Sequence, residues 1–224
     1  MSKKKLKMSL IFNILIVLCT IFAFVIRVTG WSFMQGYEII LNETTWGVFK
    51  FFTVDSNLLM AIIAFIFVIF EIHILCGKSK DIPRNMYLVK LMGTASVSLT
   101  FLVVFLYLSW IVQGGVHTMI MNSNLFLHLI TPVLSIITFV CFENTSKLKF
   151  SDTFLGLVPM ALYGIFYLGN VISHIEHGKV SLKYDWYCFL QKGTWTMIIV
   201  IPLIFILTYI SSYLLWKFNK KKVK

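Results

Sequence analysis

Two short stretches of this sequence place a hydroxyl and an imidazole where acyl-transfer chemistry would need them. Residues 51–59 read FFTVDSNLL and carry Thr53, and residues 124–134 read NLFLHLITPVL and carry His128. A neutral imidazole takes the proton of a hydroxyl as that hydroxyl attacks an ester, and later returns it to the leaving alcohol. The two residues are therefore the minimum set for nucleophilic ester hydrolysis.

The helical positions around Thr53 decide which side chains can serve one site. Thr53, Ser56 and Asn57 share a helix face through i, i+3 and i+4 spacing, whereas Asp55 is displaced by about 200° and points elsewhere. The amide of Asn57, or that of Asn124 in the second stretch, is suited to donate to a developing oxyanion.

The second stretch continues as a polar stripe along one helix face. Its members recur at a 4-3-4-3 spacing: Asn124, His128, Thr131, Ser135 and Thr138. Lipid does not tolerate such a stripe, so it is predicted to face the interior of a helix bundle. Pro132 lacks an N–H, which frees the carbonyl of His128 and predicts a kink there.

Purely structural roles are also consistent with these residues. Thr53 is a suitable N-cap, and Asp55 in the first turn interacts favourably with the helix dipole. His128 is equally suited to a structural hydrogen bond within the bundle.

The elements that must position these residues follow from composition. The chain is 58% hydrophobic with a mean hydropathy of +0.86, which indicates an integral membrane protein. We predict an all-α polytopic fold with a single transmembrane domain over residues 1–224. Six transmembrane helices are expected at about residues 9–26, 52–75, 87–113, 124–142, 153–172 and 194–216. Arg27 closes the first run without a small-residue cleavage site, which favours a membrane span over a signal peptide.

The net charge of +11 is distributed as membrane topology requires, so no nucleic-acid partner is expected. Fifteen of the twenty Lys and Arg residues fall on the side of the two termini, including Lys90 beside the second loop. This asymmetry predicts a multi-pass protein of the cell membrane with both termini cytoplasmic. On that side, Glu71 is expected near the end of the second helix, and residues 76–86 and 143–152 are expected to form charged, solvated loops.

The third helix carries small and hydroxylated residues at spacings of 3, 4 and 7. These are Gly93, Ser96, Thr100 and Tyr107, which are predicted to share one face and to allow close helix packing.

Two other classes of function remain open. His174 and His177 lie nearly on one helical face, and His128 or Asp55 would complete a three-ligand zinc site in a metal-dependent membrane hydrolase. Alternatively, the polar stripe and Asp55 line a polar path in a small transporter or channel, or belong to a lipid-binding scaffold. The four cysteines contain no C-x-x-C motif, and neither a disulfide framework, a metal nor another cofactor is expected.

The strings FFTVDSNLL and NLFLHLITPVL resemble the paired signatures of a family of small bacterial six-span membrane proteins. That family is similar to the eukaryotic androgen-induced and androgen-dependent TFPI-regulating proteins, membrane threonine hydrolases that cleave fatty-acid esters of hydroxy fatty acids. The resemblance implies Thr53 as nucleophile and His128 as base in a lipid-ester hydrolase, with membrane lipids and an acyl-ester substrate as partners. Residues 184–195 are similar to an aromatic segment of the bacterial relatives, but the proline and aspartate of that segment are not in place.

This hypothesis depends on one spatial relation. Thr53 and His128 enter their helices at similar depths, so the two helix ends are expected to face each other and to share a pocket near the outer surface of the membrane.

Overall fold

The structure, a computed structural model, describes residues 2–35, 45–111, 114–177, 179–190 and 194–221. Within these ranges, six helices are long and apolar enough to span a membrane: Lys3–Thr29, Phe52–Leu75, Arg84–Leu108, Leu125–Phe142, Phe150–Ser173 and Met197–Lys220. The predicted all-helical protein with six spans is therefore confirmed. The predicted second span matches in both bounds, and residues 112 and 113 of the predicted third span lie outside the described ranges.

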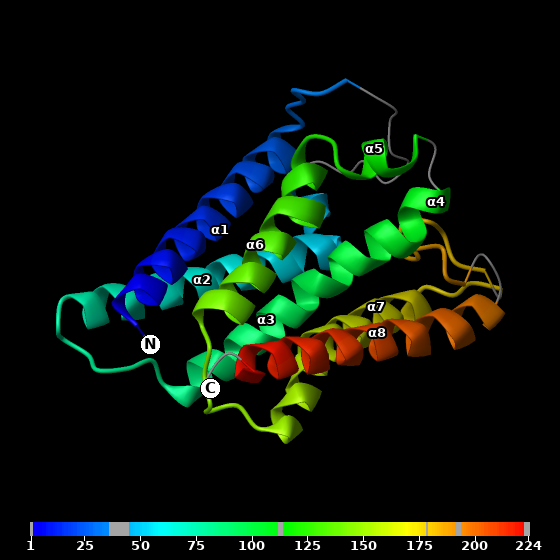
Figure 1. The fold of residues 1–224 in the computed structure, drawn as a ribbon. Coiled ribbons are helices and arrows are strands. Elements are labelled where there is room, and N and C mark those ends of the chain that lie inside the picture. The colour runs from blue at the N-terminus through cyan, green and yellow to red at the C-terminus, as the bar shows by residue number, and fades with distance from the viewer. Residues whose placement is uncertain (1, 36–44, 112–113, 178, 191–193, 222–224) are drawn as a thin grey trace.

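The described residues form eight α-helices and several short helical segments of other types (Figure 1). The α-helices are α1 (Lys3–Thr29), α2 (Phe52–Leu75), α3 (Arg84–Val103), α4 (Ser109–Ile111), α5 (Gly115–Met119), α6 (Thr131–Ile137), α7 (Val158–Ser173) and α8 (Thr194–Lys221). The π-helical segments are Val104–Leu108, Leu125–Ile130 and Thr138–Phe142, and the 3-10 segments are Thr45–Lys50 and Phe150–Leu157.

Helix α3 runs through the middle of the bundle and contacts α2, α6, α7 and α8 (Figure 1). Gly93 permits the close approach of α2, because a Cβ at this position would lie 2.7 Å from Cδ1 of Ile63. Ser96 and Thr100 are buried and donate to carbonyls of their own helix, as polar groups in lipid must. The prediction of a packed face of small residues is confirmed for these three residues.

Tyr107 does not belong to that face, and its inclusion was wrong. Half of its surface is exposed. The π-helical segment Val104–Leu108 precedes α4, and its wider turn changes the angular phase of every side chain beyond Val103.

The fourth span is not a continuous α-helix. A π-helical segment, Leu125–Ile130, leads into α6, and a second, Thr138–Phe142, follows it. The Thr131 N–H donates to the carbonyl of Phe126, five residues earlier. The irregularity expected at Pro132 therefore takes the form of π-helical hydrogen bonding in the preceding turn.

The two ends of the bundle differ in composition. Helix α1 begins and α8 ends at the same end (Figure 1), together with residues 76–83 and 143–149. We call this end, which carries most of the lysines, the basic end. The opposite end, which we call the aromatic end, is formed by residues 30–35, 45–51, 114–124, 174–177 and 179–190.

Three charged residues near the basic end lie inside the protein, and one of them, Glu143, was predicted in a charged loop. Glu71, Lys90 and Glu143 have no exposed surface. Glu71 and Lys90 lie within their predicted spans, but hydropathy along one segment does not show that a charge near the end of a span is buried against another helix.

Candidate functional site

The aromatic-end start of α2 contacts the fourth span through the side chain of Asn57. Asn57 Nδ2 donates to the carbonyl of Thr53 at 2.8 Å and to the carbonyl of Leu127 at 3.0 Å. Leu127 lies five residues before Pro132, which has no N–H to complete the π-helical pattern. The carbonyl freed by Pro132 is thus that of Leu127 rather than that of His128, and Asn57 satisfies it. The predicted apposition of the two helix ends is confirmed.

His128 follows Leu127 directly and is buried at 8% exposure. Its Nδ1 lies 2.9 Å from the carbonyl of Met119, in α5. Because a carbonyl can only accept, this contact places the imidazole proton on Nδ1 and leaves Nε2 with a free lone pair. The backbone of Met119 therefore holds the ring in the tautomer that a general base requires, a role that no side-chain spacing could indicate.

Thr53 is partly exposed, one helical turn before Asn57. Its carbonyl accepts from Asn57 Nδ2 and, at 3.2 Å, from the hydroxyl of Ser56. No hydrogen bond joins the Thr53 hydroxyl to the His128 ring in the described part of the chain. The structure places the two residues on contacting segments without a hydrogen bond between their side chains.

The N-cap interpretation of Thr53 was wrong, since α2 begins at Phe52 and its N-cap is Phe51, with no capping side chain. The first free amide of the helix, Phe52 N–H, is satisfied instead by the hydroxyl of Tyr187 at 3.0 Å. Thr53 is therefore not needed to begin the helix.

The two candidate oxyanion donors, Asn57 and Asn124, differ in whether their amide hydrogens are already used. Both amide hydrogens of Asn57 are already donated to backbone carbonyls, so this side chain has none left for a substrate oxygen. Asn124, one turn before His128, is buried and makes no side-chain hydrogen bond among the described residues. Asn124 is the better placed donor of the two.

The rest of the polar stripe faces the interior, as predicted. Its members are all buried: Asn124, His128, Thr131, Ser135 and Thr138. The hydroxyls of Ser135 and Thr138 donate to carbonyls one turn earlier in their own helix, at 2.7 and 2.6 Å. Thr131 Oγ1 is buried and has no hydrogen-bond partner in the described ranges.

A cleft of about 330 Å³ lies between α2 and α7, next to this site. It is lined by Phe52, Asp55, Ser56, Leu59, Pro159, Tyr163 and Phe166. Most of the lining is apolar, and Phe166 is largely exposed toward the surrounding lipid. Neither Thr53 nor His128 lines this cleft, so it is not the shared pocket that the sequence predicted. Ser56 lines it together with Asp55, so the prediction that these two side chains point to different faces was wrong.

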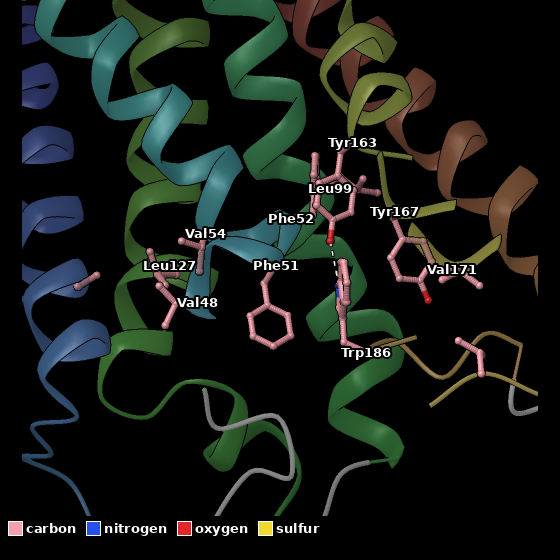
Figure 2. Close-up of a cluster of buried hydrophobic side chains, with 12 residues drawn as sticks. Val48, Phe51, Phe52, Val54, Leu99, Leu127, Tyr163, Tyr167, Val171 and Trp186 are labelled. Carbon is pink, nitrogen blue, oxygen red and sulfur yellow. Dashed lines mark hydrogen bonds between the residues drawn. The ribbon is translucent and has the colours of Figure 1, made fainter. Parts of the chain in front are cut away.

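A cluster of aromatic rings fixes the position of this end of α2 (Figure 2). Trp186 Nε1 donates to the Tyr163 hydroxyl at 3.1 Å, and that hydroxyl lies 2.6 Å from the carbonyl of Lys50. Asp185 is fully buried and accepts from the Tyr167 hydroxyl and from the N–H groups of Phe189 and Leu190. Asp185 therefore organises the loop that carries Trp186 and Tyr187.

His174, one of the two histidines of the predicted zinc site, has other contacts. The His174 ring stacks on Tyr184 with centroids 3.6 Å apart, and its Nδ1 lies 2.8 Å from the Asn170 carbonyl. No group of three or more His, Cys, Asp or Glu side chains with metal-binding geometry occurs within the described ranges. The structure thus assembles no ligand set around His174, His177 and either Asp55 or His128.

The fold defines a polytopic, all-helical membrane protein. The chain matches no protein-family model, no curated protein and no solved structure. No comparison supports the resemblance of the two sequence motifs to membrane threonine hydrolases.

Proposed function

We propose that this protein is a membrane lipid-ester hydrolase in which Thr53 is the nucleophile and His128 the base. The observation that supports it most directly is the bond from Asn57 to the Leu127 carbonyl, which holds the helix turn of Thr53 against the segment of His128. The Met119 carbonyl supports it further, because it leaves His128 Nε2 able to accept a proton.

The proposed reaction proceeds in two steps. The Thr53 hydroxyl attacks the ester carbonyl carbon, its proton passes to His128 Nε2, and the alcohol leaves with that proton. Water then attacks the threonyl ester with His128 again as base, which releases the fatty acid and restores Thr53. Asn124 donates to the oxyanion in both steps. The threonine and histidine come into hydrogen-bond contact on substrate binding, as catalytic groups commonly do.

The acyl chain has a fitting place in the cleft between α2 and α7. The cleft begins at Phe52, beside Thr53, and its volume lies within the range of ligand pockets. An acyl chain enters it from the bilayer past the exposed Phe166. Fatty-acid esters, including those of hydroxy fatty acids, are therefore the proposed substrates.

The test is covalent labelling of the purified full chain with a fluorophosphonate probe, followed by hydrolysis of a fatty-acid ester of a hydroxy fatty acid. Thr53→Ala and His128→Ala should each abolish labelling and lower turnover at least about 100-fold. Thr53→Ser should retain labelling. Ser56→Ala is the matched control, because it removes the neighbouring hydroxyl in the cleft. Labelling that survives both alanine variants would overturn the proposal.

The cleft favours one second candidate, a lipid-binding protein without catalysis. In that case Thr53→Ala leaves the binding of a photoreactive fatty-acid probe unchanged, and substitution of Leu59 by Trp, which fills the cleft, removes it. Binding without hydrolysis in the wild-type chain would decide for this candidate.

We also propose that the protein resides in the cell membrane with its basic end in the cytoplasm. The lysine asymmetry supports this orientation. Cys76 is exposed at the basic end and offers a direct test. A membrane-impermeant maleimide should modify Cys76 only after the cells are permeabilised, with Cys76→Ser as the control. Modification of Cys76 in intact cells would reverse the assignment.

A further inference from the structure

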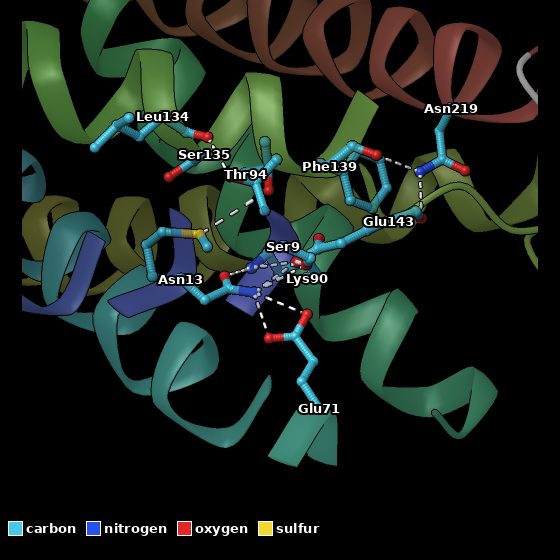
Figure 3. A network of polar contacts seen from close by, with 12 residues as sticks. Ser9, Asn13, Glu71, Lys90, Thr94, Leu134, Ser135, Phe139, Glu143 and Asn219 are labelled. Carbon is cyan, nitrogen blue, oxygen red and sulfur yellow. Dashed lines mark hydrogen bonds and ion pairs between the residues drawn. The ribbon is translucent and has the colours of Figure 1, made fainter. Parts of the chain in front are cut away.

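A fully buried cluster of charged and amide side chains lies in the basic half of the bundle (Figure 3). Its members are Ser9 and Asn13 of α1, Glu71 of α2, Lys90 of α3, and Glu143, which follows the fourth span. Their exposure is zero. The sequence spacing indicates nothing of this cluster, since its residues come from three spans and from the end of a fourth.

Lys90 is the only cation within the cluster as described. Its Nζ lies 3.0 Å from Glu143 Oε1 and donates to Asn13 Oδ1. On its third side the ammonium lies 4.5 Å from the centroid of the Phe67 ring. The three N–H groups of the Lys90 ammonium therefore all have a neighbour, and its positive charge compensates one carboxylate.

The second carboxylate has no such compensation. Glu71 is contacted by Asn13 Nδ2, which lies 3.3 Å from each of its two oxygens. The same nitrogen lies 2.9 Å from Glu143 Oε1 and 3.3 Å from Ser9 Oγ. Four acceptors therefore surround two amide hydrogens, and the cluster lacks donors.

An independent observation points to the same deficit. Glu143 Oε2 is buried and has no hydrogen-bond partner among the described residues, although Oε1 of the same carboxylate accepts from Lys90, Asn13 and Ser9. Two carboxylates and one ammonium carry a net charge of −1. A buried charge without compensation is strongly unfavourable in a membrane.

We propose that the cluster is a binding site for one exchangeable proton, shared by the carboxyl groups of Glu71 and Glu143. A proton on this pair supplies one additional donor and makes the cluster neutral. It binds to a carboxylate oxygen as an O–H bond and leaves by the reverse step, so no other reactant is required. The site is distinct from the aromatic-end site of the proposed hydrolase and does not depend on that function.

The structure also indicates how the proton reaches the cluster. A small cleft of about 40 Å³ at the basic end is lined by Leu6, Ile74, Lys80, Asp81, Ile82 and Tyr87. Leu6, Ile74 and Tyr87 each lie three residues from a cluster member, namely Ser9, Glu71 and Lys90. On three helices, therefore, the cleft lies one helical turn beyond the cluster, toward the basic end. A volume of this size accommodates a water molecule that carries a proton.

The other charged and titratable groups around the cluster have partners of their own. Lys5 donates to Asn144 at 2.6 Å, Lys147 pairs with Asp81, and Arg84 pairs with Asp152 at 2.7 Å. Asn219 of α8 donates to the backbone carbonyls of Phe139 and Glu143. The remaining titratable side chains are Lys80 and Tyr87, which both line the cleft, and Tyr87 lies one turn from Lys90.

The test is infrared spectroscopy of the full chain in lipid nanodiscs, with ¹³C-labelled glutamate to separate these carboxyls from Asp55 and Asp185. We expect a protonated-carboxyl C=O band near neutral pH that shifts with the glutamate label and in D₂O, and that disappears as the pH is raised. Glu71→Gln should remove this band. Glu176→Gln, which changes an exposed glutamate at the aromatic end, should leave it in place.

Two outcomes would overturn the proposal. If the band is absent and sodium ions raise the unfolding temperature of the wild-type chain but not of Glu71→Gln, the cluster binds a metal cation instead. If the band is absent and sodium has no effect, the cluster is a purely structural ion pair. The wild-type pH titration decides the question even if Glu71→Gln fails to fold.

Discussion

The two ends of this bundle stabilise buried carboxylates in different ways. At the aromatic end, Asp185 accepts from two backbone N–H groups within its own loop and from the Tyr167 hydroxyl. At the basic end, Glu71 and Glu143 depend on Lys90, Asn13 and side chains from several spans. The first arrangement is mainly local, and the second joins helices that are distant in sequence.

This difference has consequences for stability and for function. Loss of a local arrangement releases one loop, whereas loss of the basic-end cluster leaves charges buried between helices. The aromatic end can therefore change conformation locally while the basic end maintains the bundle. The following predictions test this contrast, beginning with the largest expected effect.

Lys90→Met should cause the largest loss of stability. The change keeps much of the side-chain volume but leaves Glu71 and Glu143 buried without their cation, which costs about 3–5 kcal/mol. The measurement is unfolding of the purified chain in mixed micelles. Lys217→Met on the exposed side of α8 is the control and should change stability by less than about 0.5 kcal/mol. Equal effects of the two variants would contradict the role assigned to the cluster.

Asp185→Asn should have an intermediate and local effect. An amide retains the shape but presents N–H groups toward the backbone N–H groups of Phe189 or Leu190, and lost bonds to a charged acceptor cost about 1.5–3 kcal/mol. Hydrogen exchange should increase in residues 179–190 and remain unchanged around Lys90. Increased exchange throughout all six spans would show that the loop is not an independent unit.

Tyr187→Phe should have the smallest effect on stability near neutral pH and a clear effect at alkaline pH. It removes the acceptor for Phe52 N–H, at a cost of about 0.5–1.5 kcal/mol. Burial raises the pKa of the Tyr187 hydroxyl above its ordinary value. The folded state therefore binds this proton more tightly than the unfolded state does, and the resulting stability is lost as the pH rises above about 10.

The phenylalanine variant should accordingly show a shallower loss of stability between neutral and alkaline pH. Tyr107→Phe, at a half-exposed tyrosine near the same end, is the control and should retain the wild-type slope. An unchanged slope in Tyr187→Phe would assign the alkaline sensitivity to other groups.

Much of the candidate aromatic-end site could be anticipated from the chain. The polar stripe was predicted to face the interior because lipid does not solvate it, and the structure confirms its burial. The proximity of the two helix ends was also predicted, from the similar depths of Thr53 and His128. The contact between Asn57 and Leu127 was not, because it depends on the π-helical turn that changes which carbonyl Pro132 leaves free.

The basic-end cluster shows the opposite result. A lysine or glutamate next to a loop is consistent both with a solvated helix end and with a buried ion pair, and the positive-inside rule counts Lys90 as if it were in water. Removal of Lys90 from that count leaves the asymmetry intact, so the topology prediction is unchanged. Burial depends on how far neighbouring helices extend, which no single segment reveals.

The sequence by itself determined the number of spans, their order and the faces that avoid lipid. The physical reason is that a bilayer requires a fixed length of apolar residues and internal satisfaction of every polar group, and both requirements act along one segment at a time. Only the tertiary structure decided which polar groups meet: Asn13 with Glu71, Lys90 with Glu143, and Asn57 with the carbonyl of Leu127. Those pairings depend on the rotation and axial offset of each helix against its neighbours, which close packing of the whole bundle sets.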